Sequence, residues 1–221
     1  MQGSHWIGFE NRRERMIQRL AKMGIGNTVL EGMANVPRHL FVEEALRTRA
    51  YDEMSLPLGL GQTISQPYTV AKMTELLLGK HPQSICKVLE IGTGCGYQTA
   101  VLLALGLQEV YSVERLRPLH ERAKRHLRAA GLLAQARLAC GDGYQGLPAV
   151  APFDGILVTA APNEIPLPLL QQLAVGGRMV LPLDEGGVQY LWLIEKTVQG
   201  YRETCVQEAN FVPLVNGSEM Q

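Results

Sequence analysis

The sequence lacks the features that mark several specialised classes of protein. No apolar stretch approaches the roughly 20 residues that a membrane-spanning helix needs, and no apolar leader opens the chain. Positive and negative charges balance, with 21 Lys and Arg against 21 Asp and Glu, so nothing attracts the whole molecule to nucleic acid or to an anionic membrane. We therefore expect neither nucleic-acid nor membrane partners. A cytoplasmic location and a monomeric state are further expectations.

Cysteine is sparse, and the four residues stand far apart, at Cys86, Cys95, Cys140 and Cys205. None belongs to a C-x-x-C pair, so we expect free thiols rather than disulfides or a zinc site. The sequence also has no G-x-S-x-G elbow and no catalytic Cys/His pattern, which argues against the common nucleophilic hydrolases. We predict that the protein has no metal centre.

Glycine, by contrast, recurs in a turn between a predicted strand and a predicted helix. Residues 88–91 (Val-Leu-Glu-Ile) have the composition of a short buried strand, and Gly92, Gly94 and Gly96 follow before a predicted helix over 97–105. A strand, a glycine turn and a helix form the first unit of a nucleotide-binding α/β sheet. Such glycines let the backbone approach a ligand, and the helix start offers unpaired N–H groups.

The spacing of this turn distinguishes between ligands. Tyr97 stands where the dinucleotide fingerprint G-x-G-x-x-G requires its third glycine. Glu90 would repel a pyrophosphate but could accept hydrogen bonds from an ammonium group. The pattern E-x-G-x-G-x-G after a strand resembles motif I of class I S-adenosylmethionine-dependent methyltransferases. A glycine turn that binds no ligand is the alternative.

The remaining segments predict an α/β fold with a doubly wound, mostly parallel sheet. Strands are expected over 109–113, 136–140, 154–158 and 178–182, and helices over 117–130 and 164–173. Three strand-like pieces, 190–195, 201–207 and 211–215, follow with no clear helix between them, which indicates an antiparallel, β-rich C-terminal edge. We expect a group of N-terminal helices, called the helical cap, in front of the sheet. Its helices are expected over 7–23, 40–46 and 70–78, and Asn27 is expected to be the N-cap residue of a further helix.

Residues 56–68 lie between these helices and have neither helical nor strand periodicity. They are rich in glycine, proline and small hydroxyl residues, so we expect an ordered loop. A long loop in a compact domain is often functional. The alternative is a plain connector in which Ser65 caps the next helix.

Acidic residues recur at the predicted strand ends, where the ligand of such a sheet binds. Glu114 comes 22 residues after Gly92 and could accept hydrogen bonds from both hydroxyls of a ribose. Asp142 and Gly143 follow the next strand and are suitably placed for an adenine edge. Residues 159–162 (Thr-Ala-Ala-Pro) are small and leave room for a substrate, and they contain no aromatic ring to stack on a base. That argues against a base-modifying enzyme.

Five motifs in this order make the resemblance specific. They are 61–67 (GQTISQP), 88–96 (VLEIGTGCG), 141–143 (GDG), 159–162 (TAAP) and 211–214 (FVPL). From about Met16 to Gly217 the chain is similar to the bacterial protein-L-isoaspartate O-methyltransferases, for which the first and last motifs are the specific ones. Asn210 departs from the pattern, because many relatives have a basic residue there.

The resemblance implies methylation of the free α-carboxylate of L-isoaspartyl residues in damaged proteins and peptides, which starts their repair through a succinimide. S-adenosyl-L-methionine would be the cofactor, S-adenosyl-L-homocysteine the product, and no metal would be needed. Because a carboxylate is already ionised at neutral pH, catalysis would consist mainly of alignment, without a general base. Ser65 could orient that carboxylate by a hydrogen bond, and the family assigns the active-site role to the matching serine.

The implied site has two parts within a single methyltransferase domain. Residues 1–80 would form the helical cap and substrate loop, and residues 81–221 the cofactor-binding sheet and C-terminal strands. A small-molecule or RNA methyltransferase on the same fold, and a non-catalytic S-adenosylmethionine-binding domain, are the alternatives. The expected cofactor-binding residues are Gln62, Thr63, Ile64, Glu90, Gly92, Gly94, Gly96, Glu114, Asp142 and Gly143, and the expected substrate-binding residues are Ser65, Tyr68, Val212 and Pro213.

Overall fold

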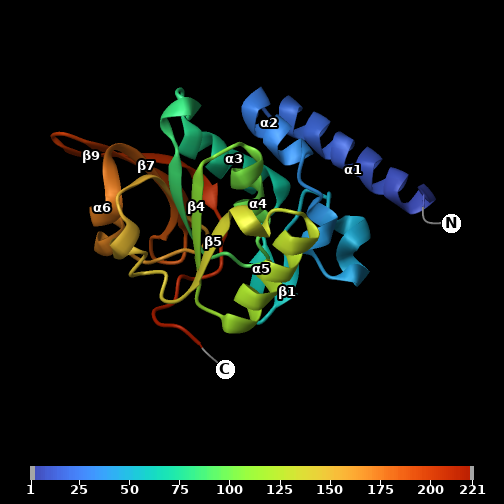
Figure 1. The fold of residues 1–221 in the computed structure, drawn as a ribbon. Coiled ribbons are helices and arrows are strands. Elements are labelled where there is room, and N and C mark those ends of the chain that lie inside the picture. Colours follow the sequence, from blue (N-terminus) through green and yellow to red (C-terminus); the bar gives the residue numbers. More distant parts are fainter. Residues whose placement is uncertain (1–2, 220–221) are drawn as a thin grey trace.

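A seven-stranded sheet forms the centre of the protein, in the order β5-β4-β3-β6-β7-β8-β9 (Figure 1). The computed structural model describes residues 3–219 of the chain. The strands from β5 to β7 run parallel, and β8 and β9 continue the sheet antiparallel at one edge, as predicted. Their bounds are β3 (Lys87–Ile91), β4 (Glu109–Glu114), β5 (Ala136–Cys140), β6 (Phe153–Val158), β7 (Leu173–Asp184), β8 (Gln189–Thr197) and β9 (Gly200–Ala209).

The parallel strands are apolar along most of their length because both faces of the sheet are covered. In β3, Val88 belongs to one buried cluster, whereas Leu89 and Ile91 belong to the cluster on the opposite face. Buried side chains of α3, α4 and α5 join the first cluster, and those of α6 join the second. The helices are α1 (Gly3–Lys22), α2 (Asn27–Ala34), α3 (Pro67–Leu78), α4 (Tyr97–Ala104), α5 (Arg117–Ala129) and α6 (Leu167–Gln172).

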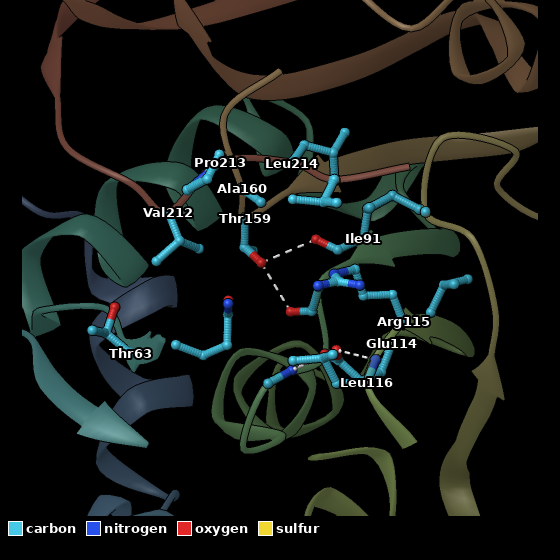
Figure 2. A pocket seen from close by; sticks show the side chains of 16 residues that line it. Thr63, Ile91, Glu114, Arg115, Leu116, Thr159, Ala160, Val212, Pro213 and Leu214 are labelled. Atoms are coloured by element: carbon cyan, nitrogen blue, oxygen red, sulfur yellow. Dashed lines mark hydrogen bonds between the residues drawn. The ribbon is translucent and has the colours of Figure 1, made fainter. Parts of the chain in front are cut away.

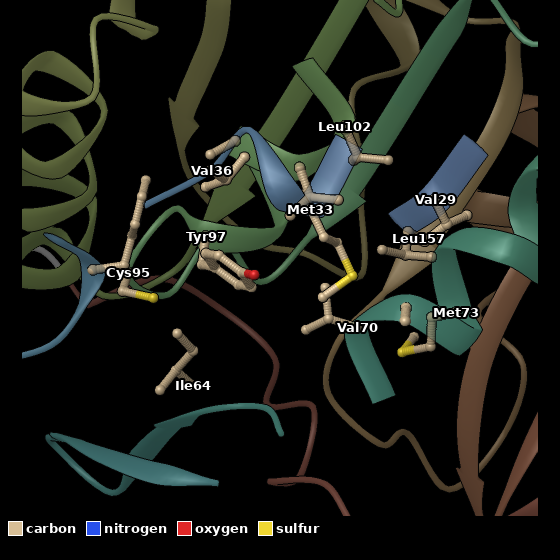
Figure 3. Packing of buried hydrophobic residues seen from close by; sticks show 14 of the residues in the cluster. Val29, Met33, Val36, Ile64, Val70, Met73, Cys95, Tyr97, Leu102 and Leu157 are labelled. Carbon is tan, nitrogen blue, oxygen red and sulfur yellow. The ribbon is translucent and has the colours of Figure 1, made fainter. Parts of the chain in front are cut away.

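The helical cap and the sheet share one apolar core, part of which Figure 3 shows. Val29 and Met33 of α2 lie in the same cluster as Tyr97 of α4 and Leu157 of β6, and all four are at most 2% exposed. In Figure 1, α1 and α2 lie together at one side of the molecule, away from α6. Burial of these side chains gives the cap a fixed position relative to the sheet.

Two details of the predicted cap are wrong. Asn27 is the first residue of α2 rather than its cap, because Gly26 occupies the N-cap position and makes no side-chain hydrogen bond. The helix expected over 40–46 is replaced by two short 3₁₀ helices, Arg38–Phe41 and Glu44–Arg49. Val42 between them is extended, with φ −121° and ψ 160°, so it interrupts any continuous helix.

The ordered loop predicted over 56–68 contains a β-hairpin that the sequence did not predict. Strand β1 (Leu56–Gly59) pairs antiparallel with β2 (Gln62–Ile64). The turn between them has positive φ at Leu60 (54°) and Gly61 (69°), as a tight hairpin turn requires. The buried alternation of Leu56 and Leu58 was the strand signal that the glycines and prolines obscured.

Three boundaries also differ at the C-terminal side. Helix α6 is shorter than the predicted 164–173, and β7 begins at Leu173 rather than at 178. Residues 211–215 form no strand of the sheet and instead contact the loop after β6 through an isolated bridge between Ala161 and Pro213. The sheet therefore gains two strands after β7, not three.

Candidate active site

The site lies where the sheet order reverses, at the carboxyl ends of β3 and β6. Strands β4 and β5 extend the sheet from one side of β3, and the chain then returns to place β6 on the other side. Such a switch point leaves a crevice in which open α/β sheets bind their ligands. The glycine turn follows β3 directly, and the loop beginning at Thr159 follows β6.

The glycine turn requires its first glycine for two reasons. Gly92 has φ 94°, a conformation that side chains other than glycine adopt with strain. A Cβ at this position would also lie 2.4 Å from Oγ1 of Thr159. That hydroxyl donates to the carbonyl oxygens of Ile91 (3.0 Å) and Gly92 (2.8 Å), so the two loops are joined across the crevice (Figure 2).

A pocket opens beside this turn, and Figure 2 shows side chains from distant parts of the chain around it. It contains eight of the residues predicted from the sequence, which are Gln62, Thr63, Gly92, Gly94, Glu114, Gly143, Val212 and Pro213. The other lining residues were not among the predicted site residues. Ile91, Thr159, Ala160 and Leu214 belong to the sequence motifs, whereas Val113, Arg115, Leu116 and Val215 only lie close in sequence to predicted residues or motifs.

Glu114 is almost fully buried at the end of β4, with 5% of its surface exposed. Its Oε2 accepts from the backbone N–H of Gly94 (2.8 Å) and its Oε1 from that of Leu116 (2.9 Å). Burial raises the pKa of this carboxyl, and the backbone hydrogen bonds offset part of that effect. Glu114 therefore supports the glycine turn, and each oxygen keeps a second lone pair for a ligand hydroxyl.

Glu90 lines an adjoining pocket that shares Thr63, Gly92, Gly94 and Thr159 with the first. Its side chain is completely buried, and Oε2 accepts from the Thr99 hydroxyl at 2.5 Å. Its Oε1 has no hydrogen-bond partner among the described residues. Burial raises the pKa of Glu90 to about 8. A buried carboxyl with one unpaired oxygen is suited to a cationic ligand group, which would favour the ionised form of the carboxyl.

The C-terminal segment reaches the pockets through backbone pairing. Ala161 donates its N–H to the carbonyl of Val212 (2.8 Å), and Leu214 donates to the carbonyl of Ala161 (2.8 Å). These bonds place Val212, Pro213 and Leu214 along the wall of the first pocket (Figure 2). The FVPL motif thus acts by closing the crevice rather than by adding a strand.

Three predicted residues lie outside the lining of both pockets. Gly96 is the N-cap of α4 and has φ 88°, a conformation that favours glycine, and a Cβ there would lie 3.3 Å from Cγ of Leu127 on α5. Asp142 is half-buried and accepts from the backbone N–H of Tyr144 (2.9 Å). Tyr68 is half-buried on α3, and its N–H donates to Oε1 of Glu53 (2.7 Å).

Ser65 stands where the second pocket meets a polar groove. It lines both, next to Ile64 in the pocket and next to Gln66 in the groove. Its hydroxyl makes no hydrogen bond to another described residue. The N-cap of α3 is Gln66, without a side-chain cap hydrogen bond, so the reading of Ser65 as a helix cap is wrong. The groove is lined by Ser55, Ser65, Gln66, Thr69, Lys72, Leu191, Gln207, Glu208, Ala209, Asn210 and Phe211.

Within residues 3–219, no group of three His, Cys, Asp or Glu side chains is placed to hold a metal ion. Within the same range, no helix is both long enough and apolar enough to cross a membrane.

The switch-point crevice, the glycine turn and the acidic strand ends define a class I, Rossmann-like methyltransferase. The family model described as protein-L-isoaspartate(D-aspartate) O-methyltransferase matches residues 11–219, so the chain belongs to this family. It is accordingly an S-adenosylmethionine-dependent enzyme that methylates L-isoaspartyl residues.

Individual relatives agree with this assignment. The chain is 59% identical over 210 residues to a protein-L-isoaspartate O-methyltransferase of Chromobacterium violaceum. The matched region covers 94% of this chain and 92% of that relative. A relative from Dechloromonas aromatica is 54% identical over 220 residues, covering 97% and 99%. A solved protein-L-isoaspartate O-methyltransferase structure matches with a TM-score of 0.81 at 30% identity, over 91% of this chain and 65% of that one.

The fold is also found in a putative protein-L-isoaspartate O-methyltransferase from Plasmodium falciparum, in complex with S-adenosyl-L-homocysteine. It has a TM-score of 0.81 at 23% identity and covers 92% of this chain and 98% of that one.

Proposed function

We propose that the two pockets and the groove form one active site, in which the cofactor and an isoaspartyl peptide meet at Ser65. The observation that carries this proposal is the position of Ser65, which lines both the pocket that contains Glu90 and the polar groove outside it. A residue at that junction can contact a substrate in the groove while the methyl donor occupies the pocket.

The pockets fit S-adenosylmethionine on two features of the chain. The buried Oε1 of Glu90, which has no hydrogen-bond partner among the described residues, suits the ammonium of the amino-acid moiety. The turn at Gly92 leaves no room for a side chain. Glu114 would accept from the ribose hydroxyls with the lone pairs that its backbone bonds leave free. Gln62, Thr63, Ile64, Gly94 and Gly143 would line the cofactor, and Gly96 would fix the start of α4. Asp142, next to Gly143, would reach the adenine only with the carboxylate oxygen that does not accept from Tyr144.

The substrate peptide would lie in the groove between the Ser65 loop and the segment around Phe211. Val212 and Pro213 continue from this segment into the cofactor pocket, so they would contact the peptide near the reacting carboxylate. Tyr68 would support the groove from the first turn of α3. Asn210 lines the groove as a neutral residue, so it offers hydrogen bonds and no charge to an acidic peptide.

When bound, S-adenosylmethionine supplies an activated methyl group that passes to the ionised α-carboxylate of the substrate. The Ser65 hydroxyl would donate a hydrogen bond to one carboxylate oxygen and turn the other toward the methyl group. No proton has to be removed from a carboxylate, so the site needs no general base. The contribution of the protein is the alignment of the reacting atoms in a crevice closed by Val212 and Pro213.

At the level of the whole chain, residues 1–80 would supply the cap and substrate loop, and residues 81–221 the cofactor-binding part, of a single domain. The balanced charge favours a protein that acts without binding nucleic acid. The loop after β6 also argues against a nucleic-acid substrate, because residues 159–162 contain no aromatic ring that could stack on a base. We also retain the expectation of a cytoplasmic monomer, as part of this proposal.

The decisive experiment is methyl transfer from labelled S-adenosylmethionine to paired peptides that differ only in isoaspartate against aspartate. Label should enter the isoaspartyl peptide as a base-labile ester and leave the aspartyl peptide unlabelled. A short RNA and a small catechol serve as control acceptors. Equal labelling of both peptides, or labelling of the RNA or the catechol alone, would refute the proposed substrate.

A further inference from the structure

Arg38 is an unusual residue because its charged side chain is completely buried (0% exposed). It opens the 3₁₀ helix Arg38–Phe41 in the cap. Within residues 3–219, no carboxylate lies within ion-pair distance of its guanidinium, and its Nη1 has no hydrogen-bond partner. A buried charge without a counterion is costly, so a role for this side chain has to come from the contacts that it makes.

Those contacts join three separate segments. Nε donates to the carbonyl of Ala50 (2.6 Å), and Nη2 donates to the carbonyl of Ser65 (2.6 Å). The guanidinium carbon lies 4.5 Å from the centroid of the Tyr97 ring, at the start of α4. Because the guanidinium is planar and its N–H groups point in fixed directions, the two carbonyls are held at defined positions relative to each other.

The bond to Ser65 determines how this residue is presented. Its carbonyl is directed to Arg38 in the interior, while its side chain lines the pocket and the groove. Three residues later, the N–H of Tyr68 donates to Oε1 of Glu53 (2.7 Å), and Glu53 pairs with Arg19 of α1 (3.3 Å). The segment 65–68 is therefore attached to the cap by a charge-assisted bond at each end.

We propose that Arg38 is a positioning residue for the methyl transfer, acting through the Ser65 carbonyl to hold the Ser65 hydroxyl in line with the substrate carboxylate. This inference rests on the proposed role of Ser65. The competing explanation is that Arg38 only stabilises the cap, in which case its replacement lowers the rate no more than any equally destabilising change nearby.

The first test compares Arg38→Lys with Val29→Ala, which trims a buried cap residue that lies on α2. Lysine keeps the charge but cannot direct two bonds as the guanidinium fork does. We expect kcat for an isoaspartyl peptide to fall roughly tenfold to a hundredfold in Arg38→Lys, as for a small misplacement of a reacting group. The Kd for S-adenosylhomocysteine should stay within about threefold, because Arg38 itself does not line either pocket. A fall in kcat no larger than in Val29→Ala, at a matched loss of melting temperature, would overturn the inference.

A double-mutant cycle then tests the route of the effect. If Arg38 acts through Ser65, Arg38→Lys should lower kcat much less in a Ser65→Ala background than in the wild type. Additive losses would contradict the inference and leave the proposed function intact. Full activity of Ser65→Ala alone would instead refute the proposed role of Ser65, so the two failures are distinguishable.

A backbone variant covers the case in which Arg38→Lys does not fold. Replacing Gln66 by its α-hydroxy acid analogue converts the Ser65–Gln66 amide into an ester, whose carbonyl is a weaker hydrogen-bond acceptor. This change leaves every buried side chain in place. We expect a lower kcat with an unchanged Kd for S-adenosylhomocysteine, and an unchanged kcat would overturn the inference.

Discussion

Ser65 combines a tethered backbone with a hydroxyl that has no partner among the described residues. Ser65→Ala should lower the single-turnover rate roughly tenfold to a thousandfold, because an orienting hydrogen bond to the reacting carboxylate is lost. The melting temperature should hardly change, since Gln66 and not Ser65 occupies the N-cap of α3. Ser65→Thr keeps the hydroxyl and should retain partial activity. A fully active Ser65→Ala enzyme would remove this residue from the mechanism.

Glu90 should make the stability of the ligand-free protein depend on pH. Burial raises its pKa from an ordinary 4.5 to about 8, so the folded state prefers the protonated carboxyl. Its contribution to stability is complete below pH 4.5 and is lost as the pH rises through about 8. Between pH 5 and pH 9 the free energy of unfolding should therefore fall by a few kcal/mol more in the wild type than in Glu90→Gln.

Urea unfolding of both proteins at several pH values, without cofactor, measures this difference. The variant serves as the control, because every other titrating group is common to the two proteins. Parallel pH profiles would show that Glu90 is not the group responsible.

Sequence reasoning was most accurate for residues whose chemistry depends on the local pattern. Glu90, Gly92 and Glu114 follow from their offsets to a strand end, and all three line the pockets. Arg38 had no such signal, because its importance comes from contacts 12 and 27 residues away that only the fold creates. Asp142 was placed correctly at a strand end, but its direction toward its own turn could not be deduced from spacing.

At the scale of elements, Gly92 of the glycine turn can be compared with Gly106, which follows α4 and lies outside that turn. Gly92 and Gly106 both have positive φ, 94° and 81°, but a Cβ would meet Oγ1 of Thr159 only at Gly92. Gly106→Ala should lose about 1–2 kcal/mol of stability, the cost of the left-handed conformation alone. Gly92→Ala should lose more, because the Thr159 hydroxyl has to leave its bonds to Ile91 and Gly92.

Denaturant unfolding measures the loss of stability in each variant, and titration calorimetry with S-adenosylhomocysteine measures the change in affinity. We expect at least tenfold weaker binding for Gly92→Ala and nearly unchanged binding for Gly106→Ala. Equal losses of stability and affinity in the two variants would mean that the contact with Thr159 is unimportant.

The elements that sequence reasoning missed share a physical cause. Leu60 takes the left-handed region that non-glycine residues rarely occupy, so the hairpin turn was not recognisable from composition. Residues 211–215 have strand-like composition, yet their backbone pairs with the loop at Ala161 and adds no strand beyond β9. In both places tertiary contacts, which a local pattern does not contain, determine the backbone conformation.

At the scale of the whole molecule, the proposed peptide groove is lined by segments of the cap, β8, β9 and the residues after it. An extended peptide that bonds to backbone groups is recognised with little regard to its side chains. Isoaspartyl peptides with different flanking residues should therefore have kcat/KM values within about tenfold of one another. A series that varies only the two residues on each side of the isoaspartate measures this, and activity confined to one flanking sequence would contradict the proposed groove.

The order of elements along the chain made the overall architecture predictable. Regular alternation of strands and helices from residue 87 onward predicts a parallel sheet, and the loss of helices after residue 173 predicts the antiparallel edge. The attachment of the cap was not predictable, because its shared core with α4 and β6 depends on side chains far apart in sequence.

The proposed cofactor pocket takes one wall from residues 62–63 and another from residues 212–215, which are far apart in the sequence. During synthesis on the ribosome, the glycine turn and Glu114 emerge long before the segment that closes the crevice. A nascent chain that has not yet released residues 212–215, or a copy cleaved by a protease after β9, therefore lacks one wall of this pocket.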